Sequence, residues 1–354
     1  METKRVLIGM SGGVDSAAAA LILQRQGYTV AGCTLQLYRS ECGGCGSAQE
    51  AEDARGAAEA LGIPFYSPDE SEAFKIYVMN NFVETYCAGR TPNPCIRCNR
   101  FIKFEALLRA ADELGMDYIA TGHYAGVRYD DTLNRWQLLR GEDRGKDQSY
   151  VLYPLSQKVL SRLLLPLSGM EKSAVRALVA ERGLKQAGKP DSQDICFVPD
   201  GDYVSFLQKN GVELLPGDFV DRDGKVLGRH RGQVCYTSGQ RRGLGVSADR
   251  PLYVVRKNGA DNTVLLGDEA DLYARTVWAE EFNWVSLPPA AEPVFVTAKT
   301  RYSQREAAAV LYSEGDGKVR VEFEESQRAV TAGQSLVCYQ GELVVGGGVI
   351  TGAK

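Results

Sequence analysis

The stretch MSGGVDS, Met10 to Ser16, decides the fold because it lies between a buried strand and a helix. The apolar run at residues 6–10 predicts the strand, and residues 15–26 predict a helix that ends at Gly27. Residues 28–32 predict the next strand. A glycine turn between a parallel strand and a helix presents backbone amides and a positive helix end. The sequence therefore predicts a βαβ unit whose turn binds an anion.

This turn lacks the lysine of the ordinary phosphate-binding motif, because no Lys or Arg lies between Arg5 and Arg25. The pattern Ser-Gly-Gly-Val-Asp-Ser resembles the pyrophosphate-binding loop of ATP pyrophosphatases, which release pyrophosphate and pass AMP to a substrate. The structural alternative is a glycine turn with a Ser or Asp helix cap. The resemblance implies that the turn binds ATP and that Mg²⁺ supplies the missing cation.

Length and composition indicate an ordinary soluble protein. The 354 residues suffice for two or three domains, and 44% are hydrophobic and 24% charged. A net charge of -4 argues against indiscriminate coating of nucleic acid, but it allows a folded RNA bound by local basic patches. Without a signal-peptide pattern or a long apolar span, we expect a cytoplasmic protein that makes no membrane contact.

The first half of the chain alternates helical and strand-like segments. Residues 48–61 and 104–114 predict helices that end at Gly62 and Gly115, and residues 118–121 predict a buried strand. Residues 155–183 are predicted to be helical again. This alternation predicts an α/β domain with a parallel sheet, whose ligands bind at the carboxyl ends of the strands.

After about residue 199 the pattern changes to short strands separated by hairpin signals such as Asp223-Gly224 and Asn258-Gly259. At residues 319–324 apolar and charged side chains alternate strictly. We expect a small, mostly β middle domain and a C-terminal antiparallel β-barrel. The expected domain boundaries are 1–203, 204–272 and 273–354.

Nine cysteines in a chain without a secretion signal favour thiol or metal chemistry over a disulfide framework. Two prolines at residues 92 and 94 predict that Cys95 and Cys98 lie on a stiff loop outside the core. Four cations near this segment predict a lowered thiol pKa: Arg90, Arg97, Arg100 and Lys103. Cys196 lies between the polar residues 191–194 and an apolar pair.

Three other cysteines lie in apolar runs and are predicted to be small buried side chains. They are Cys33, Cys235 and Cys338.

Eight short motifs occur in order along the chain. They are MSGGVDS at 10–16, GRTPNP at 89–94, CN at 98–99, ATGHY at 120–124, KDQSY at 146–150, ICF at 195–197, GQRRGLG at 239–245 and KTRY at 299–302. Together they resemble the tRNA-specific 2-thiouridylases over essentially the whole chain. The resemblance implies a PP-loop catalytic domain that replaces the C2 oxygen of the wobble uridine in tRNA by sulfur, using ATP.

The chemistry explains why such an enzyme needs both ATP and thiols. A uracil carbonyl oxygen is a poor leaving group until AMP is transferred onto it with release of pyrophosphate. The resemblance implies that Cys196 carries a persulfide whose outer sulfur attacks C2, and that Cys98 is its nucleophilic partner. The resulting disulfide bond is reopened by cellular reductant. A cysteine desulfurase or a sulfur-relay protein is the implied sulfur donor.

The resemblance also assigns binding residues by position. The implied ATP site comprises Gly9, Met10, Ser11, Gly12, Gly13, Val14, Asp15, Ser16, Leu35 and Gly122. The implied neighbours of the target base are Asn93, Pro94 and Cys95. The implied tRNA contacts are His123, Lys146, Asp147, Gln148, Arg301, Tyr302 and Gln334. Basic segments at 90–103, 140–146, 229–231 and 241–242 are the candidate strip for tRNA.

Two positions depart from the family pattern. Cys95 stands where many members have an aspartate proposed to act as an acid or base, and Leu35 stands where methionine is common. Cys95 also creates a Cys-x-x-Cys pair, which with Cys196 has the thiols to hold three irons of a [4Fe-4S] cluster. The pair Cys42 and Cys45 would complete a four-thiolate zinc set with Cys95 and Cys98, at the expense of Cys98 chemistry.

The alternatives to a persulfide-dependent thiolase are therefore threefold. The same thiolation can use sulfur held on a [4Fe-4S] cluster. A small-molecule AMP-forming ligase of the same superfamily would explain the turn but not the thiols. A non-catalytic, metal-stabilised RNA-binding module would explain the cysteines but not the turn.

Overall fold

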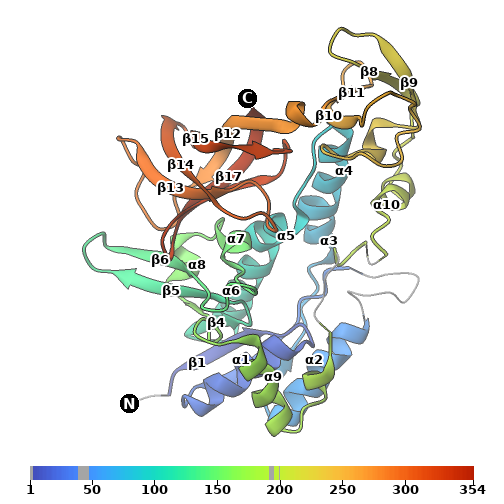
Figure 1. Cartoon of the computed structure of the whole chain (residues 1–354). Helices are drawn as coiled ribbons and strands as arrows, with labels where there is room; N and C mark the ends of the chain where they lie inside the picture. Colours follow the sequence, from blue (N-terminus) through green and yellow to red (C-terminus); the bar gives the residue numbers. More distant parts are fainter. Residues whose placement is uncertain (1–2, 39–47, 191–194, 199) are drawn as a thin grey trace.

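The computed structural model describes residues 3–38, 48–190, 195–198 and 200–354. Figure 1 shows an N-terminal α/β unit at the bottom, a small β unit at the upper right and a β-barrel at the upper left. The predicted pair Cys42 and Cys45 and the polar run 191–194 lie outside the described residues.

The N-terminal unit is built on a five-stranded parallel sheet of order β3-β2-β1-β4-β7. Its strands are β1 (Arg5–Gly9), β2 (Thr29–Cys33), β3 (Phe65–Tyr66), β4 (Tyr118–Thr121) and β7 (Leu163–Leu164). Helices cover both faces, as alternation along β1 demonstrates: Val6 and Ile8 pack with one group of helices and Leu7 with the other.

The helices on the Val6 and Ile8 face are α1 (Val14–Arg25), α2 (Ala48–Leu61) and α9 (Lys172–Glu181). Those on the Leu7 face are α6 (Phe104–Glu113) and α8 (Gln157–Leu160). The prediction of continuous helix over 155–183 is wrong, because β7 separates α8 from α9. Leu163 is buried in the sheet, where an apolar run too short for a helix pairs with β4.

A helical rod connects this unit to the middle of the molecule (Figure 1). It consists of α3 (Ser71–Phe74), the π-helix η1 (Lys75–Asn80) and α4 (Asn81–Cys87). Then α5 (Pro94–Cys98) and the π-helix η2 (Asn99–Lys103) lead directly into α6. The short elements α7 (Ser149–Leu152) and η3 (Lys185–Gly188) complete the N-terminal unit.

The middle unit shares a core with that rod. Its helix α10 (Tyr203–Lys209) precedes a four-stranded sheet of order β10-β11-β8-β9. The strands are β8 (Gly217–Val220), β9 (Val226–His230), β10 (Tyr253–Asn258) and β11 (Thr263–Gly267), with short helices η4 (Gln233–Cys235) and η5 (Glu269–Leu272). Phe82 of α4, Phe197 and Phe206 of α10 meet in its core.

The C-terminal strands form a closed antiparallel barrel of order β12-β15-β14-β13-β16-β17, since β12 also pairs with β17. They are β12 (Tyr273–Asn283), β13 (Val294–Lys299), β14 (Ala307–Gly315), β15 (Lys318–Arg328), β16 (Ser335–Gln340) and β17 (Leu343–Ala353). In β15 the apolar residues at 319, 321 and 323 are buried and their neighbours are not, as the alternation predicts. The predicted fold class is confirmed.

One hairpin of the N-terminal half joins the barrel. The strands β5 (Ala125–Asp130) and β6 (Arg135–Arg140) extend its sheet where Leu139 pairs with Leu343. This addition fixes the barrel beside the carboxyl end of β4, where the α/β unit carries its predicted ligand site. Among the described helices, none has both the length and the apolar character needed to cross a bilayer.

Candidate active site

The glycine turn follows β1 and is held by hydrogen bonds to the neighbouring strand. The Met10 amide donates to the Cys33 carbonyl at 2.7 Å, and the Thr34 hydroxyl donates to the Met10 carbonyl at 2.5 Å. Ser16 closes the turn, since its Oγ accepts from the Ser11 amide at 3.2 Å and donates to the Gly13 carbonyl at 3.2 Å. The Ser16 hydroxyl thus shapes the turn.

Two glycines of the predicted ATP site allow close backbone approach. Gly12 has a φ of +71°, and a Cβ there would lie 2.7 Å from the Glu50 carbonyl oxygen and 2.8 Å from Asp53 Cβ. A Cβ at Gly122, after β4, would lie 2.6 Å from the Asp15 carbonyl carbon. Helix α2 and the end of β4 therefore pack directly on the turn and on the start of α1.

Two lysines distant in sequence provide the cations that the motif itself lacks. Lys172, at the start of α9, donates to both carboxylate oxygens of Asp15 at 2.7 Å, and Tyr124 donates to the same carboxylate at 2.8 Å. Lys189 donates to the Gly12 carbonyl at 3.1 Å and forms an ion pair with Asp53. Sequence reasoning missed both lysines, because neither lies in a recognisable pattern and only the fold brings them to the turn.

The cysteine segment is a helix rather than the predicted stiff loop. Asn93 caps α5, its side-chain oxygen accepting from the Ile96 amide at 3.3 Å, and Pro94 occupies the first helical position. Cys98 is consequently buried in the core shared by the helical rod and the middle unit, whereas Cys95 is exposed. The predicted position outside the core therefore holds for Cys95 alone. The prediction of a loop was wrong because Asn-Pro is also a helix start signal, in which proline needs no amide partner.

The predicted lowering of the thiol pKa is also wrong for the protein alone. Burial raises the pKa of Cys98 to about 11 and that of Cys95 above its ordinary value. The arginines turn elsewhere: the Arg97 guanidinium lies 4.3 Å from the Phe101 ring centre, and Arg100 pairs with Glu281 at 2.5 Å. Only Lys103 acts in the predicted sense, and it lowers the pKa of both thiols by less than burial raises it.

Cys196 lies close enough to these two thiols for their charges to interact. Its residue is exposed, whereas its neighbour Phe197 is buried against Phe74 and Phe82. The surrounding protein raises the Cys196 pKa to about 12, and Cys98, Cys95 and Glu50 add to the increase. Solvent reaches Cys196, yet its thiol sits among enough protein atoms to be partly desolvated. The fold therefore brings the three predicted catalytic thiols into one neighbourhood.

The barrel braces the segment that carries the predicted target-base residues. Gln334 donates its side-chain amide to the carbonyls of Thr91, at 3.2 Å, and Pro92, at 3.0 Å. A Cβ at Gly333 would lie 2.7 Å from the Thr91 carbonyl oxygen. Gln334 therefore fixes the backbone of residues 91 and 92, directly before the predicted target-base residues.

Several of the other predicted tRNA residues also use polar groups inside the protein. The Gln148 side chain accepts from the Tyr124 amide at 3.1 Å, and Asp147 accepts from the Gly141 amide at 3.0 Å. Arg301 donates to the Ala329 carbonyl at 2.8 Å and to the Thr331 hydroxyl at 2.6 Å. Tyr302 is exposed and donates to the Asp147 carbonyl at 3.2 Å.

His123 has the environment of a neutral imidazole. Its Nδ1 lies 2.8 Å from the Thr121 hydroxyl, and burial lowers its pKa to about 3. It therefore offers hydrogen bonds rather than positive charge to any ligand at the end of β4.

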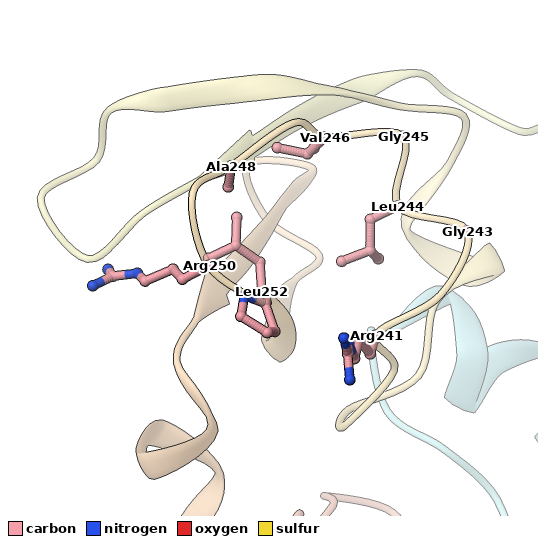
Figure 2. Close-up of a pocket in the computed structure, with 9 residues that line it drawn as sticks. Arg241, Gly243, Leu244, Gly245, Val246, Ala248, Arg250 and Leu252 are labelled. Atoms are coloured by element: carbon pink, nitrogen blue, oxygen red, sulfur yellow. The ribbon is translucent and has the colours of Figure 1, made fainter.

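The candidate basic strip is partly neutralised. Arg140 pairs with Glu306, Arg144 with Glu342, and Arg229 with Asp218 at 3.7 Å. The loop 241–252 of the middle unit lines a hollow of about 280 Å³. Figure 2 shows the side chains of Arg241 and Arg250 on two separate parts of this loop.

The described residues offer no ready metal site. Within them, no group of three or more His, Cys, Asp and Glu side chains is arranged to hold a metal ion. As placed here, Cys95, Cys98 and Cys196 thus do not form a ligand set for a [4Fe-4S] cluster. The zinc hypothesis depends on Cys42 and Cys45, which lie outside the described residues.

Comparisons with known proteins cover the whole chain. Three family models match in order: a tRNA methyl transferase HUP domain at residues 4–200, a tRNA methyl transferase PRC-barrel domain at 204–268 and an aminomethyltransferase beta-barrel domain at 274–350. The tRNA-specific 2-thiouridylase MnmA of Acetivibrio thermocellus is 49% identical, with 99% of this chain and 100% of the relative covered.

Two further relatives carry the same name. The protein of Carboxydothermus hydrogenoformans is 47% identical, with 98% of this chain and 97% of the relative covered. The protein of Clostridioides difficile is 44% identical, with 98% of this chain and 98% of the relative covered. The model descriptions refer to methyl transfer, whereas these full-length relatives are named for thiolation. Identity of this degree over the full length decides between them: the chain belongs to the tRNA-specific 2-thiouridylase family.

Proposed function

We propose that this protein is an ATP-dependent tRNA-uridine 2-sulfurtransferase that thiolates the wobble uridine and releases pyrophosphate and AMP. The observation that carries the proposal is the identity of 44–49% over the full length to relatives named as tRNA-specific 2-thiouridylases. The structure supports it, because Cys95, Cys98 and Cys196 lie close enough for their charges to interact. A ligase acting on a small molecule would have no use for these thiols.

In the proposed first step the turn and the N-terminus of α1 bind the phosphates of ATP. The uridine C2 oxygen attacks the innermost phosphorus, so that an O–P bond forms and pyrophosphate leaves. Mg²⁺ bound with ATP would supply positive charge to the departing pyrophosphate. Residues 91–95, braced by Gln334, are proposed to hold the target base, with tRNA contacts from His123, Lys146 and Tyr302.

In the proposed second step Cys196 carries a persulfide received from a cysteine desulfurase or a sulfur-relay protein. Its outer sulfur attacks C2 and AMP leaves with the former uridine oxygen. The Cys98 thiolate then attacks the Cys196 sulfur and breaks the S–S bond, which leaves sulfur on the base and a Cys98–Cys196 disulfide. Cellular thiols reduce that disulfide before the next turnover.

The protonation states of the isolated protein fit a resting enzyme. With thiol pKa values near 11 and 12, Cys98 and Cys196 are protonated at neutral pH. Cys98 must lose its proton before it can act as a nucleophile, and Lys103 is the described cation that favours this loss. Cys95, in place of an aspartate, is proposed to exchange a proton at the target base.

We propose that three segments of the chain divide the work. Residues 1–203 bind ATP and carry the thiols, residues 204–272 contact tRNA, and residues 273–354 form the barrel. The barrel in the last segment holds the target-base segment in place through Gln334.

The test replaces one thiol at a time. Cys98→Ser and Cys196→Ser should each abolish 2-thiouridine formation, measured by mass spectrometry of tRNA nucleosides, while tRNA affinity persists. Cys87→Ser, which changes an exposed cysteine outside the site, is the matched control. Full activity in either variant would remove the sulfur-transfer assignment.

Two further measurements address the alternatives. AMP formation that needs added tRNA excludes the small-molecule ligase, and AMP formation without tRNA supports it. Iron content and visible absorption of anaerobically purified protein address the [4Fe-4S] route. Colourless, iron-free protein that still thiolates supports the persulfide route.

A further inference from the structure

The ammonium group of Lys189 lies at the edge of the glycine turn. It follows η3, and its ammonium group donates to the Gly12 carbonyl while it pairs with Asp53 of α2. Its side chain is 38% exposed, so the group can move without unpacking the core. Lys172, the other lysine at the turn, donates to the carboxylate of Asp15.

The charges around Gly12 make this arrangement unusual for a site that must receive an anion. Asp53 packs against Gly12, and Glu50 stands in the same turn of α2. Negative side chains beside a triphosphate raise its free energy of binding unless a cation lies between them. Lys189 already touches both the carboxylate and the turn, so a rotation of its side chain suffices to exchange one oxygen partner for another.

We propose that Lys189 is a phosphate-binding residue of the ATP site, held beside the turn by Asp53 and transferred to the triphosphate when ATP binds. This inference rests on the proposed function, because it assumes that the turn binds ATP. It assigns the missing lysine of the phosphate-binding motif to a residue far along the chain.

Lys172 has a different role. It donates to both carboxylate oxygens of Asp15 at 2.7 Å, its side chain is only 12% exposed, and the Tyr124 hydroxyl donates to the same carboxylate. This buried, bidentate pair fixes α9 against the start of α1. Lys189 holds its carboxylate in a more exposed pair and is therefore the cation available for exchange.

The experiment measures equilibrium binding of a nonhydrolysable ATP analogue, and separately of inorganic pyrophosphate, to the full-length protein. A hydrogen bond from a charged group contributes enough that Lys189→Met should weaken both affinities by about 10- to 100-fold. Lys189→Arg should retain most of the affinity, because it keeps the charge. Lys185→Met removes an exposed lysine of η3 and should leave both affinities unchanged.

The variant Asp53→Asn distinguishes two roles of the Lys189–Asp53 ion pair: holding Lys189 until it moves to ATP, or only stabilising the structure. If Asp53 only holds Lys189 until ATP arrives, this variant should bind the analogue as tightly as the unmodified protein, or up to several-fold more tightly. Equal binding by Lys189→Met and the unmodified protein would overturn the proposal. So would a loss in Asp53→Asn as large as that in Lys189→Met.

Controls keep the outcomes distinct. Melting temperature and tRNA affinity report whether each variant folds, and if Lys189→Met does not fold, Lys189→Arg and Asp53→Asn decide the proposal. Failure of the unmodified protein to bind the analogue at all would instead contradict the proposed function and leave the glycine turn without its ligand.

Discussion

The glycine turn and the cysteine helix, the two parts of the proposed site, are built differently. In the turn, the polar side chains of Ser16 and Asp15 are hydrogen-bonded. Around the cysteine helix, the Thr91 hydroxyl and the Arg97 Nε are buried without a hydrogen-bond partner, and the thiols have raised pKa values.

Under the proposed function, this difference bears on how the protein prepares the two half-reactions. A turn whose Ser16 and Asp15 side chains are already hydrogen-bonded is preorganised and needs little rearrangement to receive phosphates. Buried polar atoms without hydrogen-bond partners cost free energy. The region around the cysteine helix therefore gains stability when a ligand supplies those partners. We therefore expect ATP to bind a formed site, whereas the thiol site is completed by its RNA substrate.

The largest expected effect comes from filling the space at the turn. Gly12→Ala should abolish ATP binding and reduce thiolation more than 100-fold, because its Cβ would meet the α2 backbone at 2.7 Å. Gly62→Ala is the matched control, since Gly62 has a similar φ of +67° and no atom within 4 Å of its Cβ. It should cost roughly 1 kcal/mol of stability and no activity. Similar losses of ATP affinity in both variants would mean that backbone strain, not contact, governs the turn.

The next effect concerns the reactivity of Cys98. At pH 8 the fraction of Cys98 present as thiolate is roughly 200-fold below that of free cysteine. Because the Cys98 thiolate is more basic, each thiolate reacts roughly tenfold faster than that of free cysteine, which offsets part of this difference. Iodoacetamide should therefore modify it at least about 20-fold more slowly than it modifies glutathione. The rate should rise with pH until about 11, because the raised pKa keeps the thiol protonated below that value.

Peptide mass spectrometry after timed alkylation measures this rate. Cys338, which is buried in the barrel, should stay unmodified and so reports that the protein is folded. If Cys98 reacted as fast as glutathione at pH 8, the expectation that its thiol is buried and protonated in the free protein would be contradicted. Lys103→Met should slow the reaction further, since it removes the cation that lowers the Cys98 pKa.

The smallest effect tests the unpartnered hydroxyl of Thr91. Thr91→Val keeps the shape and removes a buried hydroxyl that has no partner, so it should stabilise the free protein by about 1 kcal/mol. The same change should weaken tRNA binding severalfold, because the substrate loses a hydrogen-bond partner. Thermal unfolding and tRNA titration measure the two effects. A destabilised variant with unchanged tRNA affinity would show that this hydroxyl is already satisfied in the free protein.

The sequence was sufficient where local signals and periodicity act alone. The helix at 48–61, the strands around the glycine turn and the alternation in β15 follow from spacing and end signals, and all three are confirmed. The buried states of Cys33, Cys235 and Cys338 are confirmed too. The segment 155–183 failed because a short buried strand and a buried helix have the same apolar composition.

The sequence by itself determined the glycine turn between strand and helix and the order of the three units, and it singled out three candidate site cysteines, because each of these signals lies in neighbouring residues. Only the tertiary structure decided which charges act on them. Lys172 and Lys189 reach the turn through α9 and η3, while Arg97 and Arg100, next to the thiols in sequence, turn towards Phe101 and Glu281. Electrostatic influence depends on distance and burial in space, and neither is written in the local sequence.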